Sequence, residues 1–165
     1  MLSNQENLAG PLIVGFIPHQ HPEVLTCATD LAHQLGVPLV FAYVKPDSYL
    51  TEWGFSKNII NRSLHPDDLD EENTVDALTL LETIEAHIVG RDVSWRLRIL
   101  AGEPWRALSR LADESCASML IIGTRRTSVS SRISVLVGES TGAHLAAYQQ
   151  RPLLIVPPAH RRHDH

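Results

Sequence analysis

Two continuous apolar segments near the beginning of the chain, separated by an amphipathic one, predict a strand–helix–strand unit. The apolar segments cover 11–17 and 37–44, and uninterrupted segments of this length are typical of strands buried on both faces. Between them, apolar residues recur at helical spacing over 21–35, and Gly36 follows as a terminator. Two strands joined by such a helix pair in parallel.

The rest of the chain continues the alternation of strands and helices. Helices are expected to begin near Pro66, at Pro104 and near Glu139, and further strands are expected over 93–100, 119–122 and 152–156. Five strands that alternate with four helices predict an α/β domain, a doubly wound five-stranded parallel sheet with helices on both faces. The domain is expected to cover 11–157, with flexible ends at 1–10 and 158–165.

Two segments depart from this simple pattern. In 93–100, apolar residues alternate with serine and arginine. Such alternation indicates a strand with one solvated face or a strand at a sheet edge, and we predict an edge. Segment 45–65 contains three aromatic residues without a clear period, which predicts a long loop or a short helix.

The charge of the chain argues against nucleic acid and membrane partners. Fourteen basic and nineteen acidic residues give a formal net charge of −5, whereas a phosphate backbone or an anionic membrane requires a basic surface. Segment 1–10 lacks the pattern of a secretory signal, and no apolar stretch is long enough to span a membrane. A cytoplasmic location is therefore expected. Cys27 and Cys116 lie beside apolar neighbours and are expected to be buried, reduced thiols rather than a disulfide.

A ligand site is expected where the carboxyl ends of the strands meet, because open α/β sheets bind ligands at that end. The loops there are 18–22, the segment after Val44, and 123–138. The last of these combines glycines, many hydroxyl groups and three arginines. Backbone amides, hydroxyls and guanidinium groups suit a small phosphate-bearing ligand. The same composition also suits a solvated surface loop.

The sequence predicts neither catalysis nor a metal site. His19 and His21 follow the first strand, but no cysteine or acidic cluster has the spacing of further metal ligands. The sequence contains no nucleophile elbow, no complete Walker loop and no C-x-x-C motif. We expect no catalytic residue and no required cofactor.

Several short motifs, taken in their order and spacing, make the chain resemble the universal stress protein family. They are Gly102-Glu-Pro before the third helix, Leu120-Ile-Ile-Gly-Thr-Arg at the fourth strand, and Gly138 followed by Pro152-Leu-Leu-Ile-Val-Pro. The resemblance implies a sheet of order 3-2-1-4-5 and a homodimer. For the nucleotide-binding members it also implies ATP held by G-x2-G-x9-G-[S/T] after strand four and by an Asp at the end of strand one.

The chain departs from that nucleotide-binding pattern at several positions. Arg126 stands at the second glycine, and Gly138 lies two residues after the third and is followed by Glu139. If Ser140 is instead the hydroxyl position, Glu139 replaces the glycine. At the end of strand one, Ile17 stands at the position of the family's Asp. The residues expected to meet a ligand are Ile17, Pro18, His19, Val44, Gly123, Thr124, Arg125, Arg126, Ser128, Arg132, Gly138, Glu139 and Ser140.

Two functions remain open from the sequence. The first is a dimeric interaction or regulatory module of the stress response with a degenerate nucleotide site. The second is a protein that binds ATP or another adenine nucleotide through 123–138, with at most slow hydrolysis. In both cases a homodimer through 152–156 is expected, because Pro152 begins a short uncharged strand at the sheet edge and such edges are normally covered.

Overall fold

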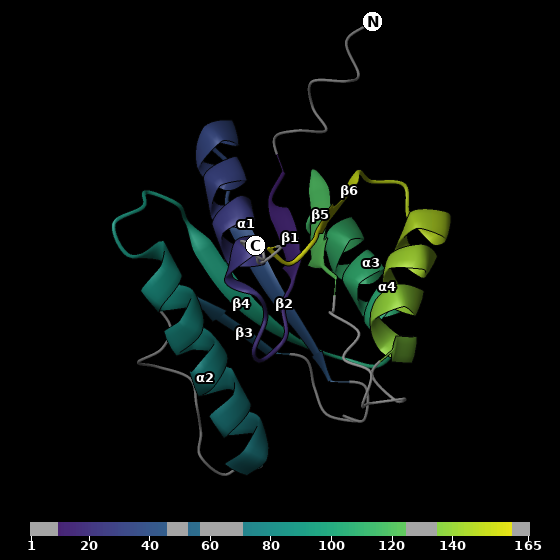
Figure 1. Cartoon of the computed structure of the whole chain (residues 1–165), viewed down its shortest axis with the longest axis horizontal. Coiled ribbons are helices and arrows are strands. Elements are labelled where there is room, and N and C mark those ends of the chain that lie inside the picture. Colours follow the sequence, from purple (N-terminus) through teal and green to yellow (C-terminus); the bar gives the residue numbers. More distant parts are fainter. Residues whose placement is uncertain (1–9, 46–52, 57–70, 125–134, 160–165) are drawn as a thin grey trace, which may run out of the picture.

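A computed structural model of the chain describes residues 10–45, 53–56, 71–124 and 135–159, in which strands and helices alternate (Figure 1). The elements are β1 (Leu12–Gly15), α1 (Pro22–Leu35), β2 (Leu39–Lys45), β3 (Trp53–Ser56), α2 (Glu71–Ile88), β4 (Trp95–Ala101), α3 (Pro104–Glu114), β5 (Met119–Gly123), α4 (Val135–Tyr148) and β6 (Leu153–Val156).

The strands form one sheet in the order β3-β4-β2-β1-β5-β6. Five of them, β4, β2, β1, β5 and β6, are parallel to one another, which confirms the predicted parallel sheet of order 3-2-1-4-5. The short strand β3 is antiparallel to β4 and extends the sheet beyond it. It lies within the segment for which a loop or a short helix was expected; 46–52 and 57–70 lie outside the described residues.

The predicted edge position of 93–100 is wrong, because β4 pairs with β2 on one side and with β3 on the other. The alternation in this strand reflects its two faces instead. Trp95 and Leu97 are buried, whereas Arg96 between them is exposed. The polar positions of β4 therefore reflect exposure on one side of the sheet and not a missing strand neighbour.

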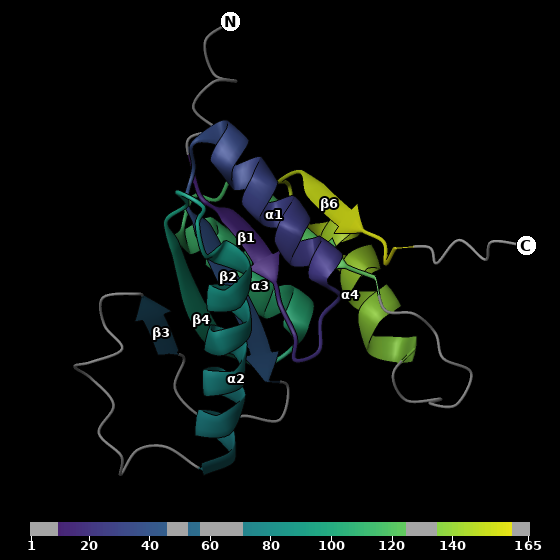
Figure 2. The same cartoon turned by 60° about the vertical axis from the view of Figure 1, so that its left-hand side comes forward.

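Helices cover both faces of the sheet, as predicted. Figure 2 shows α1 and α2 in front of the sheet and α3 and α4 behind it. Each pair of helices encloses its own hydrophobic cluster with the side chains of alternate strand positions. In β1, Leu12 and Val14 belong to the first cluster and Ile13 to the second, and all three are fully buried. This explains the continuous apolar sequence of the strand.

Local signals account for the ends of several helices. Pro22 occupies the first turn of α1, and Gly36 ends that helix with a φ of 66°, the left-handed conformation that glycine adopts without strain. Helix α4 begins at Val135 rather than near Glu139, and the expected helix start at Pro66 lies outside the described residues. The expectation that Cys116 is buried is wrong, because this residue is exposed just after α3. None of the described helices has both the length and the apolarity that crossing a membrane requires.

Candidate functional site

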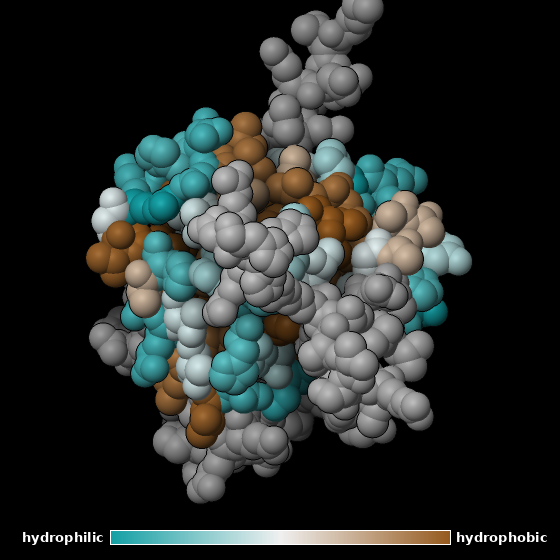
Figure 3. Space-filling view, viewed as in Figure 1, coloured by the Kyte–Doolittle hydropathy of each residue, from teal (hydrophilic) through white to brown (hydrophobic). Residues whose placement is uncertain are grey.

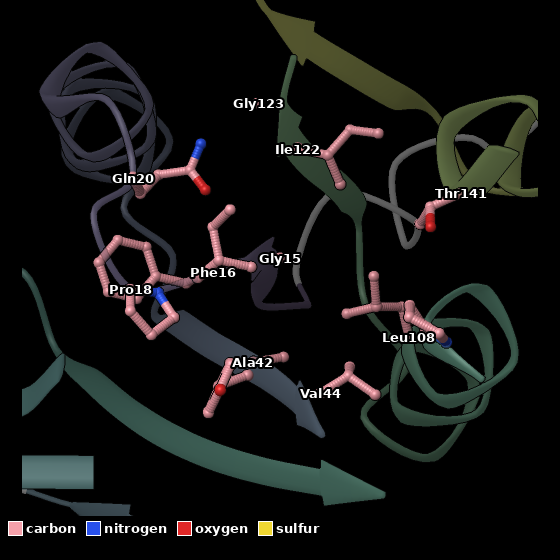
Figure 4. Close-up of a pocket in the computed structure, with 13 residues that line it drawn as sticks. Gly15, Phe16, Pro18, Gln20, Ala42, Val44, Leu108, Ile122, Gly123 and Thr141 are labelled. Atoms are coloured by element: carbon pink, nitrogen blue, oxygen red, sulfur yellow. The ribbon is translucent and has the colours of Figure 1, made fainter. Parts of the chain in front are cut away.

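A cavity of about 240 Å³ opens where the carboxyl ends of β1, β2 and β5 meet (Figure 4). β1 pairs with β2 on one side and with β5 on the other. The helix α1, which follows β1, and the helix α4, which follows β5, lie on opposite faces of the sheet. This is the point of an α/β sheet at which ligands are bound. The cavity is lined by Gly15, Phe16, Ile17, Pro18, Gln20, Ala42, Tyr43, Val44, Pro104, Leu108, Ile122, Gly123 and Thr141.

The absence of a side chain at Gly15 leaves room at the end of β1. A Cβ atom at this position would lie 3.1 Å from Cγ2 of Ile122 and 3.4 Å from Cδ1 of Leu108. The first of these separations is tighter than ordinary van der Waals contact, so a larger residue would push into the cavity wall. Gly15 thus keeps the space between the central strand and α3 open.

The described walls of the cavity are mainly apolar, and three of the side chains that line them are polar. These are Gln20, Tyr43 and Thr141. The hydroxyl of Tyr43 donates a hydrogen bond of 3.4 Å to Oδ2 of Asp76, and the same oxygen lies 3.4 Å from Nζ of Lys45. Among the described residues that line the cavity, none carries a carboxylate. Apolar walls with a few polar groups suit a flat heteroaromatic ring that is oriented by hydrogen bonds.

The structure brings only part of the predicted site residues together. Ile17, Pro18, Val44 and Gly123 line the cavity. The next residue, Thr124, donates its backbone N–H to the carbonyl oxygen of Val156 at 3.1 Å. Helix α4 contains Gly138, Glu139 and Ser140. The remaining predicted residues of the loop 123–138 lie outside the described ranges; they are Arg125, Arg126, Ser128 and Arg132.

Several lining residues were not predicted to have a role in a site. Phe16, Ala42 and Ile122 belong to strand sequences, and Leu108 belongs to the apolar stripe of α3, so their pattern indicates only burial. Gln20 lies in the predicted loop 18–22, and its position directly after a strand was the available signal.

His19 closes a tight turn between β1 and α1. The backbone N–H of Gln20 donates to the carbonyl oxygen of Ile17 at 3.1 Å, Pro18 occupies the second turn position, and His19 has a φ of 62°. A proline followed by a residue with positive φ is the pattern of a type II turn. A residue with a Cβ is strained in this conformation, so the surrounding contacts hold the turn against its local preference.

We expect the His19→Gly variant to be about 1 kcal/mol more stable than the His19→Ala variant, because only alanine retains the strained Cβ. Chemical denaturation of both variants would measure the difference. Thr26, which is exposed within α1, provides the matched control. There the Thr26→Ala variant should be about 1 kcal/mol more stable than the Thr26→Gly variant. The same order at both positions would contradict the strained turn.

A metal centre finds no support in the described part of the chain. No group of three or more histidine, cysteine, aspartate or glutamate side chains among these residues could hold an ion. His19 and His21 lie in the same loop but gain no third partner of this kind.

Comparison with known proteins identifies the family. The model of the universal stress protein family matches residues 13–157, and a search of curated proteins finds no match. Among solved structures, a universal stress protein from Archaeoglobus fulgidus is similar with a TM-score of 0.63 and 18% identity, covering 90% of this chain and 98% of that one.

Two further similar structures contain nucleotides. The Archaeoglobus fulgidus universal stress protein in complex with dAMP has a TM-score of 0.60 and 16% identity, and the match covers 90% of this chain and 97% of that one. A universal stress protein in complex with cAMP has a TM-score of 0.62 and 20% identity, and the match covers 92% and 98%. At such identities these structures support the fold, and the family model covers almost the whole chain. This chain belongs to the universal stress protein family.

Proposed function

We propose that this chain is a cytoplasmic stress-response protein that binds an adenine nucleotide in the cavity at the ends of β1, β2 and β5. The observation that carries the proposal is this cavity, with its apolar walls and its few polar side chains. Similar family members have been solved with dAMP and with cAMP. The proposed function is therefore the binding of an adenine nucleotide.

The size of the cavity indicates how the nucleotide is placed. A volume of about 240 Å³ is below the range of about 300–1,000 Å³ that is typical of sites for drug-sized ligands. The cavity therefore takes the base and part of the sugar, and the phosphates extend beyond it. Because the part of the lining that the structure describes includes no carboxylate, we expect the binding to be weak.

Equilibrium binding of labelled ATP to nucleotide-stripped protein tests this function. We expect the Ile17→Asp variant to bind ATP about tenfold more tightly than the unmodified protein, because a carboxylate can accept a charge-assisted hydrogen bond from the adenine amine or from a sugar hydroxyl. Ile17→Leu is the control, and its affinity should be unchanged. Lack of ATP binding by both the unmodified protein and Ile17→Asp would exclude the nucleotide function.

A second candidate function is that of a dimeric interaction module, and the surface of β6 supports it. In Figure 3 apolar surface gathers over β6, where Ile155 is 46% exposed. β6 is also the last strand at its side of the sheet. An apolar edge of this kind is a favourable site for pairing with a second copy of the chain.

A further inference from the structure

The side-chain amide of Gln20 lies at the cavity and against Gly123 (Figure 4). A Cβ atom added to Gly123 would collide with Nε2 of Gln20 and would lie 2.7 Å from Cγ2 of Val24. Glycine at the end of β5 therefore leaves the space that the Gln20 amide occupies. The arrangement joins the loop after β1 to the end of β5 across the cavity opening.

Gln20 differs in its hydrogen bonding from the other two polar residues in the described part of the cavity lining. Tyr43 is bound to Asp76, and Thr141 also has an interaction partner. The side-chain amide of Gln20 makes no hydrogen bond to another residue within the described ranges. The backbone N–H of Gln20 donates to the carbonyl oxygen of Ile17. An amide that lines a cavity without a protein partner is available to a ligand.

The turn that carries Gln20 is held in a strained backbone conformation. His19, the preceding residue, has a φ of 62°, and such strain persists only where the surroundings impose it. Because the hydrogen bond from Gln20 to Ile17 closes this turn, the Gln20 backbone is placed before any ligand arrives. Preorganisation of this kind favours a role in recognition.

We propose that Gln20 is the specificity-determining residue of the cavity and that it reads the edge of a purine base through a pair of hydrogen bonds. A carboxamide offers a donor beside an acceptor. It can therefore meet adenine, whose amine donor lies beside an acceptor nitrogen, and, after a half-turn of the amide, guanine, whose carbonyl lies beside an N–H donor. The site consequently accepts both purines, which extends the proposed function on which this inference rests.

The test compares ATP and GTP binding to nucleotide-stripped protein by calorimetry. The unmodified protein should bind the two nucleotides within about fivefold of each other. Gln20→Ala should weaken both by about tenfold, since a pair of neutral hydrogen bonds is lost. Gln20→Glu should weaken ATP but retain GTP, because a carboxylate only accepts and guanine offers two adjacent donors. Gln34→Ala, at an exposed position near the end of α1, is the control and should change neither affinity.

The outcomes separate this inference from the proposed function. If ATP binds and Gln20→Ala leaves both affinities unchanged, the role of Gln20 is excluded while nucleotide binding stands. Equal effects of Gln20→Glu on ATP and GTP also exclude the reading of the base edge. If the unmodified protein binds neither nucleotide, both proposals are wrong.

Gly123→Ala provides an independent measurement, because the new Cβ displaces the Gln20 amide. We expect it to weaken ATP binding in the unmodified background and to have no further effect in Gln20→Ala, the signature of two residues acting through one contact. Thermal unfolding of each variant reports any separate effect of the close approach to Val24. Additive losses of affinity would contradict the contact.

Discussion

Replacing Phe41 by alanine is expected to reduce the free energy of unfolding by about 3–5 kcal/mol, the cost of removing a large aromatic side chain from a packed core. Phe41 lies in β2 and is fully buried. Its ring makes edge contacts with two others, Phe16 at 5.8 Å and Trp95 at 6.2 Å between centroids. Such aromatic pairs add to the free energy gained by burial.

Chemical denaturation of Phe41→Ala would give the change in stability. Val89, which is 79% exposed, is the control, and Val89→Ala should change stability by less than about 0.5 kcal/mol. Phe41→Ala should also change the shape of the cavity, because Phe16 is both a neighbour of Phe41 and a lining residue. A loss of less than about 1 kcal/mol would show that the three rings are not the packed centre of this cluster.

We expect the unmodified protein to be a homodimer at micromolar concentration and Ile155→Lys to be a monomer. The dimer would form through β6, whose four residues carry no charge and which is the outermost strand on its side of the sheet. Two copies related by a two-fold axis would bring the β6 strands together in an antiparallel pair. A lysine in that contact would place an unpaired charge in an apolar interface, which is strongly unfavourable.

Sedimentation equilibrium would measure both masses. Leu78 on α2 is the matched control, because it is a large apolar residue with the same exposed fraction as Ile155, 46%, on a helix that covers the sheet away from β6. Leu78→Lys should remain a dimer. A monomer mass for the unmodified protein would exclude the interface, and a dimer of Ile155→Lys would place it on another surface.

The sequence predicts the centre of the sheet better than its margin, for a physical reason. β1 and β2 are covered by helices on both faces, so nearly every position must be apolar and the pattern is unambiguous. β3 has four residues, including Gly54, and pairs with only one neighbour. Such a strand is held by backbone pairing with β4, which leaves little trace in the order of apolar and polar residues.

The candidate site was predictable in position but only in part by residue. Ile17, Val44 and Gly123 could be named because they lie at the carboxyl ends of apolar segments, and strand ends converge in a parallel sheet. Leu108 could not, because a residue that lines a cavity and one that fills the core carry the same apolar side chain. The role of Gln20 depends on its contact with Gly123, which lies in a distant part of the sequence and becomes close only in the fold.

The position of β1 between β2 and β5 has a consequence for the protein as it is synthesised. Leu12 pairs with Leu39 on one side and with Met119 on the other. At translation rates of about 5–20 residues per second, roughly 5–20 s separate the emergence of Leu12 from that of Met119. Until then the N–H and C=O groups on one edge of β1 are unpaired, and this edge of an apolar strand can pair with other chains. Although β1 is the first strand of the sheet to leave the ribosome, its second edge is among the last to be covered.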